Sequence, residues 1–306
     1  MNRFKKILFV HADAKASGDA LRESMRLAVA NGADLAALSV SKPLPGSGSL
    51  REALINYRRQ EIDQVRRSLP EARDLSVSFE HVEGVPYVEI VKTVIRDNRD
   101  LVVKAAEKSL RGHRRGFSSG DLQLLRQCPC AVWMFKSTKP SSVGRRVMAA
   151  IDPRDDGSDD TLTRRVLEIG TSLANMAGTE SCLHVVHCWE LPFETMLRHH
   201  PFLKRSSDEM SRLSEKVEDS HRATVAAALA SVEGCNAAET LIEKGDPATA
   251  IPRLARERAA DVVVMGTLGR SGIPGHFIGN TAETILSEVP CSVLAIKPPG
   301  FRSALG

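Results

Sequence analysis

The sequence predicts an α/β protein made of two tandem halves, each with a five-stranded parallel sheet covered by helices on both faces. Three observations support this fold class. Short apolar runs alternate with amphipathic helical patterns, this alternation occurs twice, and a glycine-rich loop follows the fourth apolar run of the second half. With 306 residues, the chain is long enough for two domains that each bury a core.

An internal repeat defines the two halves, because segments of the first half recur 161 residues later. The paired segments are Gly84–Ile90 with Gly245–Ile251, Asp100–Val103 with Asp261–Val264, and Cys128–Cys130 with Val289–Cys291. Between the halves lies Ser137–Gly144, which is rich in Ser, Pro and Gly, as domain linkers usually are. We therefore expect a first domain at residues 1–140 and a second at 145–306.

Each half is expected to contain five strands, which are identified by apolar runs of four to eight residues. They are Lys6–His11, Asp34–Val40, Leu75–Val82, Leu101–Lys104 and Ala131–Phe135, then Arg146–Ile151, Cys182–Trp189, Thr240–Glu243, Val262–Met265 and Ser292–Ile296. Helices are expected over Asp19–Asn31, Arg51–Leu69, Asp159–Met176 and Ser206–Val232, and from Pro86 and Pro247, because proline suits a first helical turn. Alternating strands and helices require a parallel sheet, with ligands at the carboxyl ends of its strands.

Bulk composition indicates a globular protein without a nucleic-acid or membrane partner. The chain is 42% apolar and 26% charged, with a net charge of +4. Its six cysteines form no C-x-x-C pair, which favours reduced thiols and a cytoplasmic location. The apolar run Ile7–Val10 is too short for a signal-peptide core, and no stretch has the length of a transmembrane helix.

The segment Asp261–Glu283 has the pattern of a phosphate-binding loop. An apolar strand is followed by glycines at 266, 269, 272, 275 and 279, and then by a helix that Asn280 or Thr281 could cap, with Glu283 completing the cap. Glycine allows close approach of phosphate oxygens, and the amides and dipole of a helix N-terminus supply positive potential.

The spacing of this loop differs from a Walker A motif and from the dinucleotide fingerprint, because it lacks Gly-Lys-Ser/Thr and G-x-G-x-x-G. It reads G-x2-G-x9-G followed by a small polar residue, through Gly266, Gly269, Gly279 and Asn280. In this it resembles the ATP-binding loop of the universal stress protein family, and the whole chain resembles tandem members of the E type. The resemblance implies two fused adenine nucleotide alpha hydrolase-like, Rossmann-like domains that pair through their last strands, and homo-oligomers, with a homodimer expected.

The resemblance also implies ATP, with or without magnesium, as the ligand of the second half. Asp152 would contact the adenosine, Val185 would pack on adenine, Met265 would close the pocket and Arg270 would reach a phosphate. The full set of expected nucleotide-binding residues is Asp152, Pro153, Val185, Met265, Gly266, Gly269, Arg270, Gly279, Asn280 and Thr281. Taken singly, Asp152 could instead cap a turn, and Val185 or Met265 could belong to the core.

The first half replaces each of these key residues, so an ATP site of the same construction is not expected there. Ala105, Lys108 and Ser118 stand in place of the three glycines, and Ala12 in place of Asp152. Added Cβ atoms block close approach to a phosphate. The replaced loop is nevertheless basic, which leaves two interpretations: a solvated charged loop, or a side-chain site for another anionic metabolite. Its basic residues are Lys104, Lys108, Arg111, His113, Arg114 and Arg115.

A metal site and an enzymatic role are both weakly indicated. On one strand, Cys182, His184 and Cys188 share a face while His187 points away, and three ligands are too few for a structural zinc site, so no metal is expected.

We expect a cytoplasmic stress-response protein that binds ATP and acts through an unidentified protein partner. The alternatives are slow ATP hydrolysis or autophosphorylation, although the loop offers no Walker lysine or evident base and no residue is assigned as catalytic.

Overall fold

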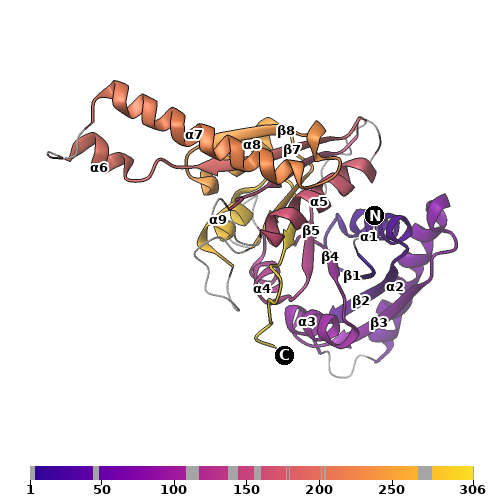
Figure 1. Cartoon of the computed structure of the whole chain (residues 1–306). Coiled ribbons are helices and arrows are strands. Elements are labelled where there is room, and N and C mark those ends of the chain that lie inside the picture. The colour runs from indigo at the N-terminus through magenta and orange to yellow at the C-terminus, as the bar shows by residue number, and fades with distance from the viewer. Residues whose placement is uncertain are drawn as a thin grey trace.

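The computed structural model describes residues 4–43, 48–107, 117–136, 144–154, 160–176, 178, 180–200, 202, 205–267 and 278–305. Its strands form one ten-stranded sheet in the order β3-β2-β1-β4-β5-β10-β9-β6-β7-β8. The first half of the chain supplies β1–β5 and the second half β6–β10 (Figure 1). Within each half all neighbouring strands are parallel, so the predicted fold class is confirmed.

The bounds of the elements agree closely with the sequence prediction. The first half contains β1 (Lys6–Val10), α1 (Ser17–Asn31), β2 (Asp34–Ser41), α2 (Gly48–Ser68), β3 (Val77–Glu83), α3 (Pro86–Asp97), β4 (Leu101–Ala105), α4 (Ser119–Gln127) and β5 (Ala131–Phe135). The second half contains β6 (Arg146–Ala150), α5 (Thr161–Met176), β7 (Cys182–Trp189), α6 (Glu194–His199), α7 (Ser207–Ala230), β8 (Glu239–Lys244), α8 (Pro247–Glu257), β9 (Val262–Gly266), α9 (Asn280–Glu288) and β10 (Ser292–Ile296). The short helix α6 was not predicted, because the sequence before α7 reads as a charged insert.

The last strands of the two halves join the sheet. β5 and β10 pair antiparallel, with Trp133 opposite Leu294, whereas all other neighbours are parallel. The Ser292 hydroxyl ties the edges together, since it accepts from the backbone N–H of Lys136 at 3.0 Å and donates to the carbonyl of that residue at 3.1 Å. This pairing is the internal pseudo-dimer that the resemblance implies.

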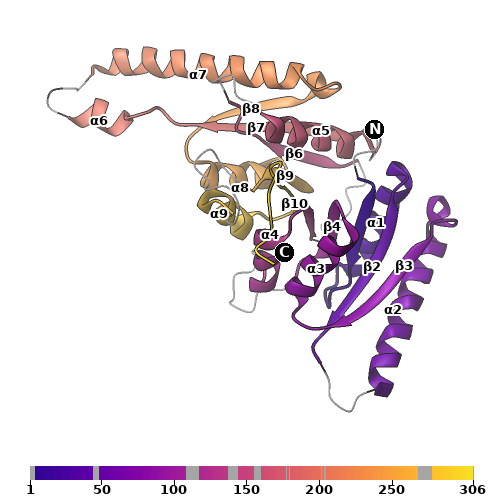
Figure 2. The ribbon, with the colours of Figure 1, turned by 60° about the horizontal axis from the view of Figure 1, so that its bottom comes forward.

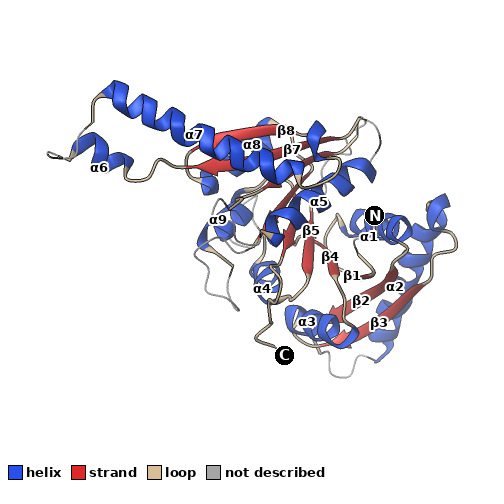
Figure 3. Ribbon diagram, in the orientation of Figure 1, coloured by secondary structure: helices blue, strands red, loops and turns tan. Residues whose placement is uncertain are grey.

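Helices cover the sheet (Figure 3), and two clusters of buried apolar side chains lie between helices and sheet, one on each face. On one face, residues of α1 and α2 cluster with Ile7 and Phe9 of β1, and residues of α5 and α7 cover the same face of the second half. On the other face, residues of α3 and α4 cluster with Leu8 and Val10, and residues of α8 and α9 cover that face of the second half. This alternation follows from the period of two along a strand, and it buries both faces as a parallel sheet requires. Among the described helices, none is long and apolar enough to cross a membrane.

The helices α6 and α7 extend beyond the sheet as an arm of the second half, and Figure 2 shows α7 along the side of β7 and β8. A small separate cluster around Trp189, Leu191 and Met210 holds the arm to β7. Helix α7 starts at a capping box, in which the Ser206 hydroxyl accepts from the backbone N–H of Glu209 and the Glu209 carboxylate accepts from that of Ser206.

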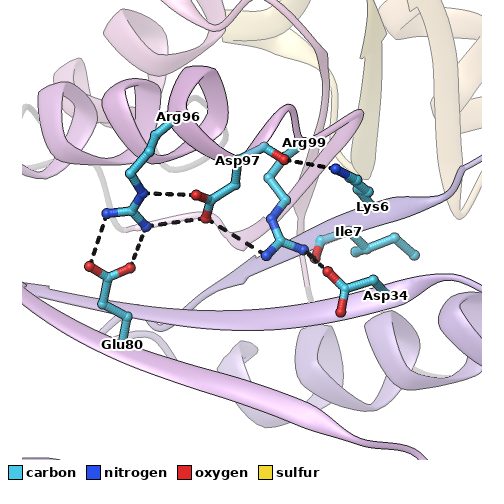
Figure 4. Close-up of polar contacts among 7 residues, drawn as sticks. All are labelled: Lys6, Ile7, Asp34, Glu80, Arg96, Asp97 and Arg99. Carbon is cyan, nitrogen blue, oxygen red and sulfur yellow. Dashed lines mark hydrogen bonds and ion pairs between the residues drawn. The ribbon is translucent and has the colours of Figure 1, made fainter.

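At the amino ends of the strands, ion pairs fix the C-terminus of α3 (Figure 4). Arg96 forms a forked contact with Glu80 and also pairs with Asp97, whose carboxyl pKa is lowered chiefly by that hydrogen bond. Arg99 donates to Asp34 at the start of β2 and to the carbonyl of Ile7. This network is structural, because it lies at the edge of the sheet opposite the strand ends where ligands are expected.

Candidate functional site

The expected nucleotide-binding residues converge at the carboxyl ends of β6 and β9. These strands are neighbours, with Ala150 opposite Met265, so Asp152, two residues beyond the end of β6, lies at the same edge as Gly266. β6 is also the point at which the connections diverge, toward β7 on one side and β9 on the other. Ligands bind at such a switch point in open α/β sheets.

Backbone hydrogen bonds close the base of the glycine loop. The N–H of Gly279 donates to the carbonyl of Thr267 at 3.0 Å, and the N–H of Thr267 donates to the carbonyl of Ile296 at 3.1 Å. The end of β9 and the start of α9 are therefore held side by side next to β10. Gly269 and Arg270 lie outside the described residues.

Helix α9 begins without a side-chain cap, contrary to the sequence prediction. Its N-cap residue is Gly279, which has no side chain to accept from the first turn, and Asn280 and Thr281 are the first two helical residues. Glu283 does not complete a capping box, because its carboxylate accepts from the Nε of Arg126 in α4 at 2.6 Å. Among the described residues, the first turn of α9 therefore lacks the side-chain cap that Ser118 gives α4.

Gly266 has a packing role independent of any ligand. A Cβ at this position would lie 2.8 Å from Cδ2 of Leu162, the second residue of α5. The absence of a side chain therefore lets the start of α5 approach the end of β9. Glycine here serves the contact between helix and strand at the site, which the sequence pattern alone attributed to phosphate approach.

Val185 and Met265 do not line one pocket with their side chains, which corrects the sequence interpretation. Val185 lies opposite Ala149 and its side chain is fully buried in the layer below α5, whereas Met265 lies opposite Ala150 in the layer below α8 and α9. Residues in register on parallel strands point to the same face, so it is Val186 that shares the face of Met265. The backbone of Val185 lies in the plane of the sheet, between the two layers.

Asp152 is exposed and Pro153 is buried at the start of the connection to α5. The helix itself is preceded by Asp160, whose carboxylate accepts from the N–H groups of Arg154 and Thr163 at 3.1 and 3.3 Å. The charge of Asp152 influences the ionisation of Cys188. Burial is the main reason that the pKa of Cys188 is raised to about 12, and nearby carboxylates, Asp152 among them, add to the effect.

At the equivalent place in the first half, the protein's own charges occupy the helix N-terminus. Ser118 and Asp121 form a capping box at the start of α4, and the Asp121 carboxylate also accepts from the N–H of Glu107 at 3.0 Å and from Nζ of Lys104 at 2.8 Å. Lys104 also pairs with the carboxylate of Glu107 at 2.8 Å. Lys104 and Asp121 are 5% and 1% exposed, so this is a buried ion pair.

This pair removes Lys104 from the basic residues that the sequence analysis grouped in one loop. Lys104 is satisfied internally and is withdrawn from any external anion, while the other basic residues of that loop, 108 to 115, lie outside the described residues. The sequence did carry a signal for the arrangement: Ser118-x-x-Asp121 is a capping-box spacing before an apolar helix. Comparison of Ser118 with Gly279 alone does not reveal this capping box, because the box also depends on Asp121.

Three of the cysteines and histidines of β7 make polar contacts that the structure describes. The sulfur of Cys182 lies 3.4 Å from Nε2 of His184, whose Nδ1 lies 3.1 Å from Glu239, and His187 contacts His221 on α7 at 2.9 Å from the opposite face. In the part of the chain that the structure describes, no group of three or more His, Cys, Asp or Glu side chains could hold a metal ion.

Comparisons with known proteins identify the family. The sequence model of the universal stress protein family matches residues 3–136 and again 144–297. Universal stress protein E of Escherichia coli K12 is 30% identical over 224 residues, which cover 71% of this chain and 67% of that protein, and its counterpart from Photorhabdus laumondii is 29% identical over 229 residues.

Solved structures give the same result for the fold. A functionally unknown protein, PA1789, from Pseudomonas aeruginosa PAO1 has a TM-score of 0.72 at 24% identity, over 97% of this chain and 94% of its own. A putative universal stress protein from Pseudomonas aeruginosa UCBPP-PA14 has the same score and coverage at 25% identity. With both halves matched by the family and the tandem architecture shared over nearly its whole length, this chain belongs to the universal stress protein family.

Proposed function

We propose that the second half binds one ATP molecule at the carboxyl ends of β6 and β9, and that the first half binds none. The chain would then act in the stress response, in the cytoplasm, through nucleotide-dependent binding or signalling. In this proposal the degenerate domain comprises residues 1–140 and the ATP-binding domain residues 145–306.

A single comparison within the molecule carries the proposal. The N-terminus of α4 is filled by the carboxylate of Asp121, and the equivalent N-terminus of α9 has Gly279 and Ala282 in place of Ser118 and Asp121. A helix N-terminus attracts anions through its free amides and its dipole. The first half supplies its own carboxylate there, and we propose that the anion of a ligand takes this place in the second half.

The surroundings of α9 agree with a nucleotide as that ligand. Asp152 is exposed at the end of β6, where a carboxylate can accept from a ribose hydroxyl, and the buried Met265 and Ile278 bring apolar atoms to the face below α9. The hydrogen bond from Gly279 to Thr267 holds the two described ends of the loop together.

Isothermal titration of the full chain with ATP, with and without magnesium, tests the proposal. We expect saturable binding with one ATP per chain. A stoichiometry of two would show that the Lys104–Asp121 pair does not block the first half, and absence of binding to the folded chain would refute the nucleotide site. Titration of Asp152→Ala tests whether the measured binding occurs at this edge of the sheet. We expect this variant to bind ATP more weakly than the wild type, with an unchanged melting temperature.

A further inference from the structure

Cys128 and Cys130 form a pair of thiols at the junction of α4 and β5. Their sulfur atoms lie 3.5 Å apart, on either side of Pro129. Cys128 is the C-cap residue of α4, and its N–H donates to the carbonyl of Leu124 at 2.9 Å, so the helix fixes its position. Non-bonded sulfurs at this distance need only a small movement to reach the 2.05 Å of a disulfide bond.

The two residues differ in exposure. Cys128 is fully buried, whereas Cys130, directly before β5, is partly exposed. Of the two, Cys130 is therefore the one that a small disulfide would approach. This is the division of roles between an attacking and a resolving thiol.

Charges around the pair favour ionisation of one thiol. Burial opposes ionisation of Cys128, yet its pKa lies below the ordinary value because the thiol of Cys130 donates to its sulfur and Lys297 is nearby. Lys297 is held there by β10, and its Nζ donates to the carbonyl of Leu125 in the last turn of α4. The pKa of Cys130 is raised well above its usual range, by burial and by the hydrogen bond to Cys128, so Cys128 is the more acidic thiol of the pair.

We infer that Cys128 and Cys130 are a dithiol exchange site that reduces low-molecular-weight disulfides. The sulfur of Cys130 passes its proton to Cys128, attacks one sulfur of the substrate and releases the first small thiol, which leaves a mixed disulfide on Cys130. The sulfur of Cys128 then attacks Cys130, and the second small thiol leaves. Two cysteine thiols and one substrate disulfide become one protein disulfide and two small thiols. The proton that Cys128 gave to solvent on ionising ends on the first small thiol, and the proton of Cys130, carried by Cys128, ends on the second.

The second half provides a matched control, because Val289 and Cys291 occupy the positions of Cys128 and Cys130. Val289 is fully buried after α9, as Cys128 is after α4. The substitution Cys128→Val therefore puts into the first half a residue that the same fold already accommodates. It removes the resolving thiol of Cys128 and leaves the thiol of Cys130 in place.

The test treats the reduced full-length chain with oxidised glutathione and follows it by intact mass and peptide mapping. We expect the wild type to lose two hydrogen masses, with Cys128 linked to Cys130 and no retained adduct. We expect Cys128→Val to retain glutathione on Cys130, and Cys130→Ser to show neither change at these positions. A stable adduct on Cys130 of the wild type, or reaction confined to the other half-buried thiols Cys182 and Cys188, would overturn the inference. Circular dichroism checks that the variants fold, and the wild-type map decides the question even if they do not.

Discussion

The ammonium of Lys104 donates to the buried carboxylate of Asp121 across 2.8 Å, at the point where the second half has Met265 and Ala282. Each half has a helix N-terminus beside a strand end, where backbone N–H groups need an acceptor. The two halves provide that acceptor in different ways. The first supplies a carboxylate and its counter-ion from its own chain. In the second, we propose, the anion comes from a nucleotide.

The Lys104–Asp121 pair yields a prediction about stability. Lys104→Met, which introduces the residue of the second half, should lower the free energy of unfolding by about 3–5 kcal/mol, because it leaves a buried carboxylate without its counter-ion. The double variant Lys104→Met/Asp121→Ala should recover much of this loss. Urea denaturation of wild type, both single variants and the double variant measures the coupling energy. Additive single effects would show that the two charges do not depend on each other.

A second prediction concerns the glycines that the first half lacks. Introducing them by Ala105→Gly, Lys108→Gly and Ser118→Gly should not create a second ATP site, because Asp121 still occupies the helix N-terminus and Ala12 still lacks a carboxylate. Calorimetry should give the same stoichiometry as the wild type. Two ATP molecules bound per chain would show that glycine content alone separates the halves.

A third prediction follows from two lysines at the β5–β10 junction, the buried Lys297 and the partly buried Lys136. Burial lowers the pKa of Lys136 and of Lys297 to about 8. Above pH 8 the folded chain therefore binds fewer protons than the unfolded chain, whose lysines titrate near 10.4, so stability rises with pH in this window. The rise is at most about 1.4 kcal/mol per pH unit for each lysine.

Buried cysteines limit that rise at higher pH. Burial raises the pKa of Cys291 to about 12, so above about pH 8.5 the folded chain retains a proton that the unfolded chain loses, and this contribution opposes the rise in stability. Urea denaturation between pH 7.5 and 8.5 isolates the lysines. Lys297→Met should flatten the slope there, and an unchanged slope would remove this lysine from the explanation.

Most of the fold followed from the sequence, because periodicity, the repeat and the proline-led helices are local signals. The missed features depend on tertiary contacts. The pairing of Arg126 with Glu283 joins residues 157 apart, and nothing in the helix α9 pattern indicates that Glu283 turns away from its own cap. The side-chain face of Val185 depends on the register of β7 with β6, which a motif aligned by type does not resolve.

The most direct test of the central claim builds the first half's arrangement into the second. In the full chain, Met265→Lys/Gly279→Ser/Ala282→Asp would give α9 a capping box and a buried ion pair like those of α4. Titration with ATP should show one binding site in the wild type and none in this variant, while the variant remains folded by circular dichroism. Gly279→Ala, which adds a Cβ but no cap, controls for size. Wild-type affinity in the folded triple variant would contradict the account.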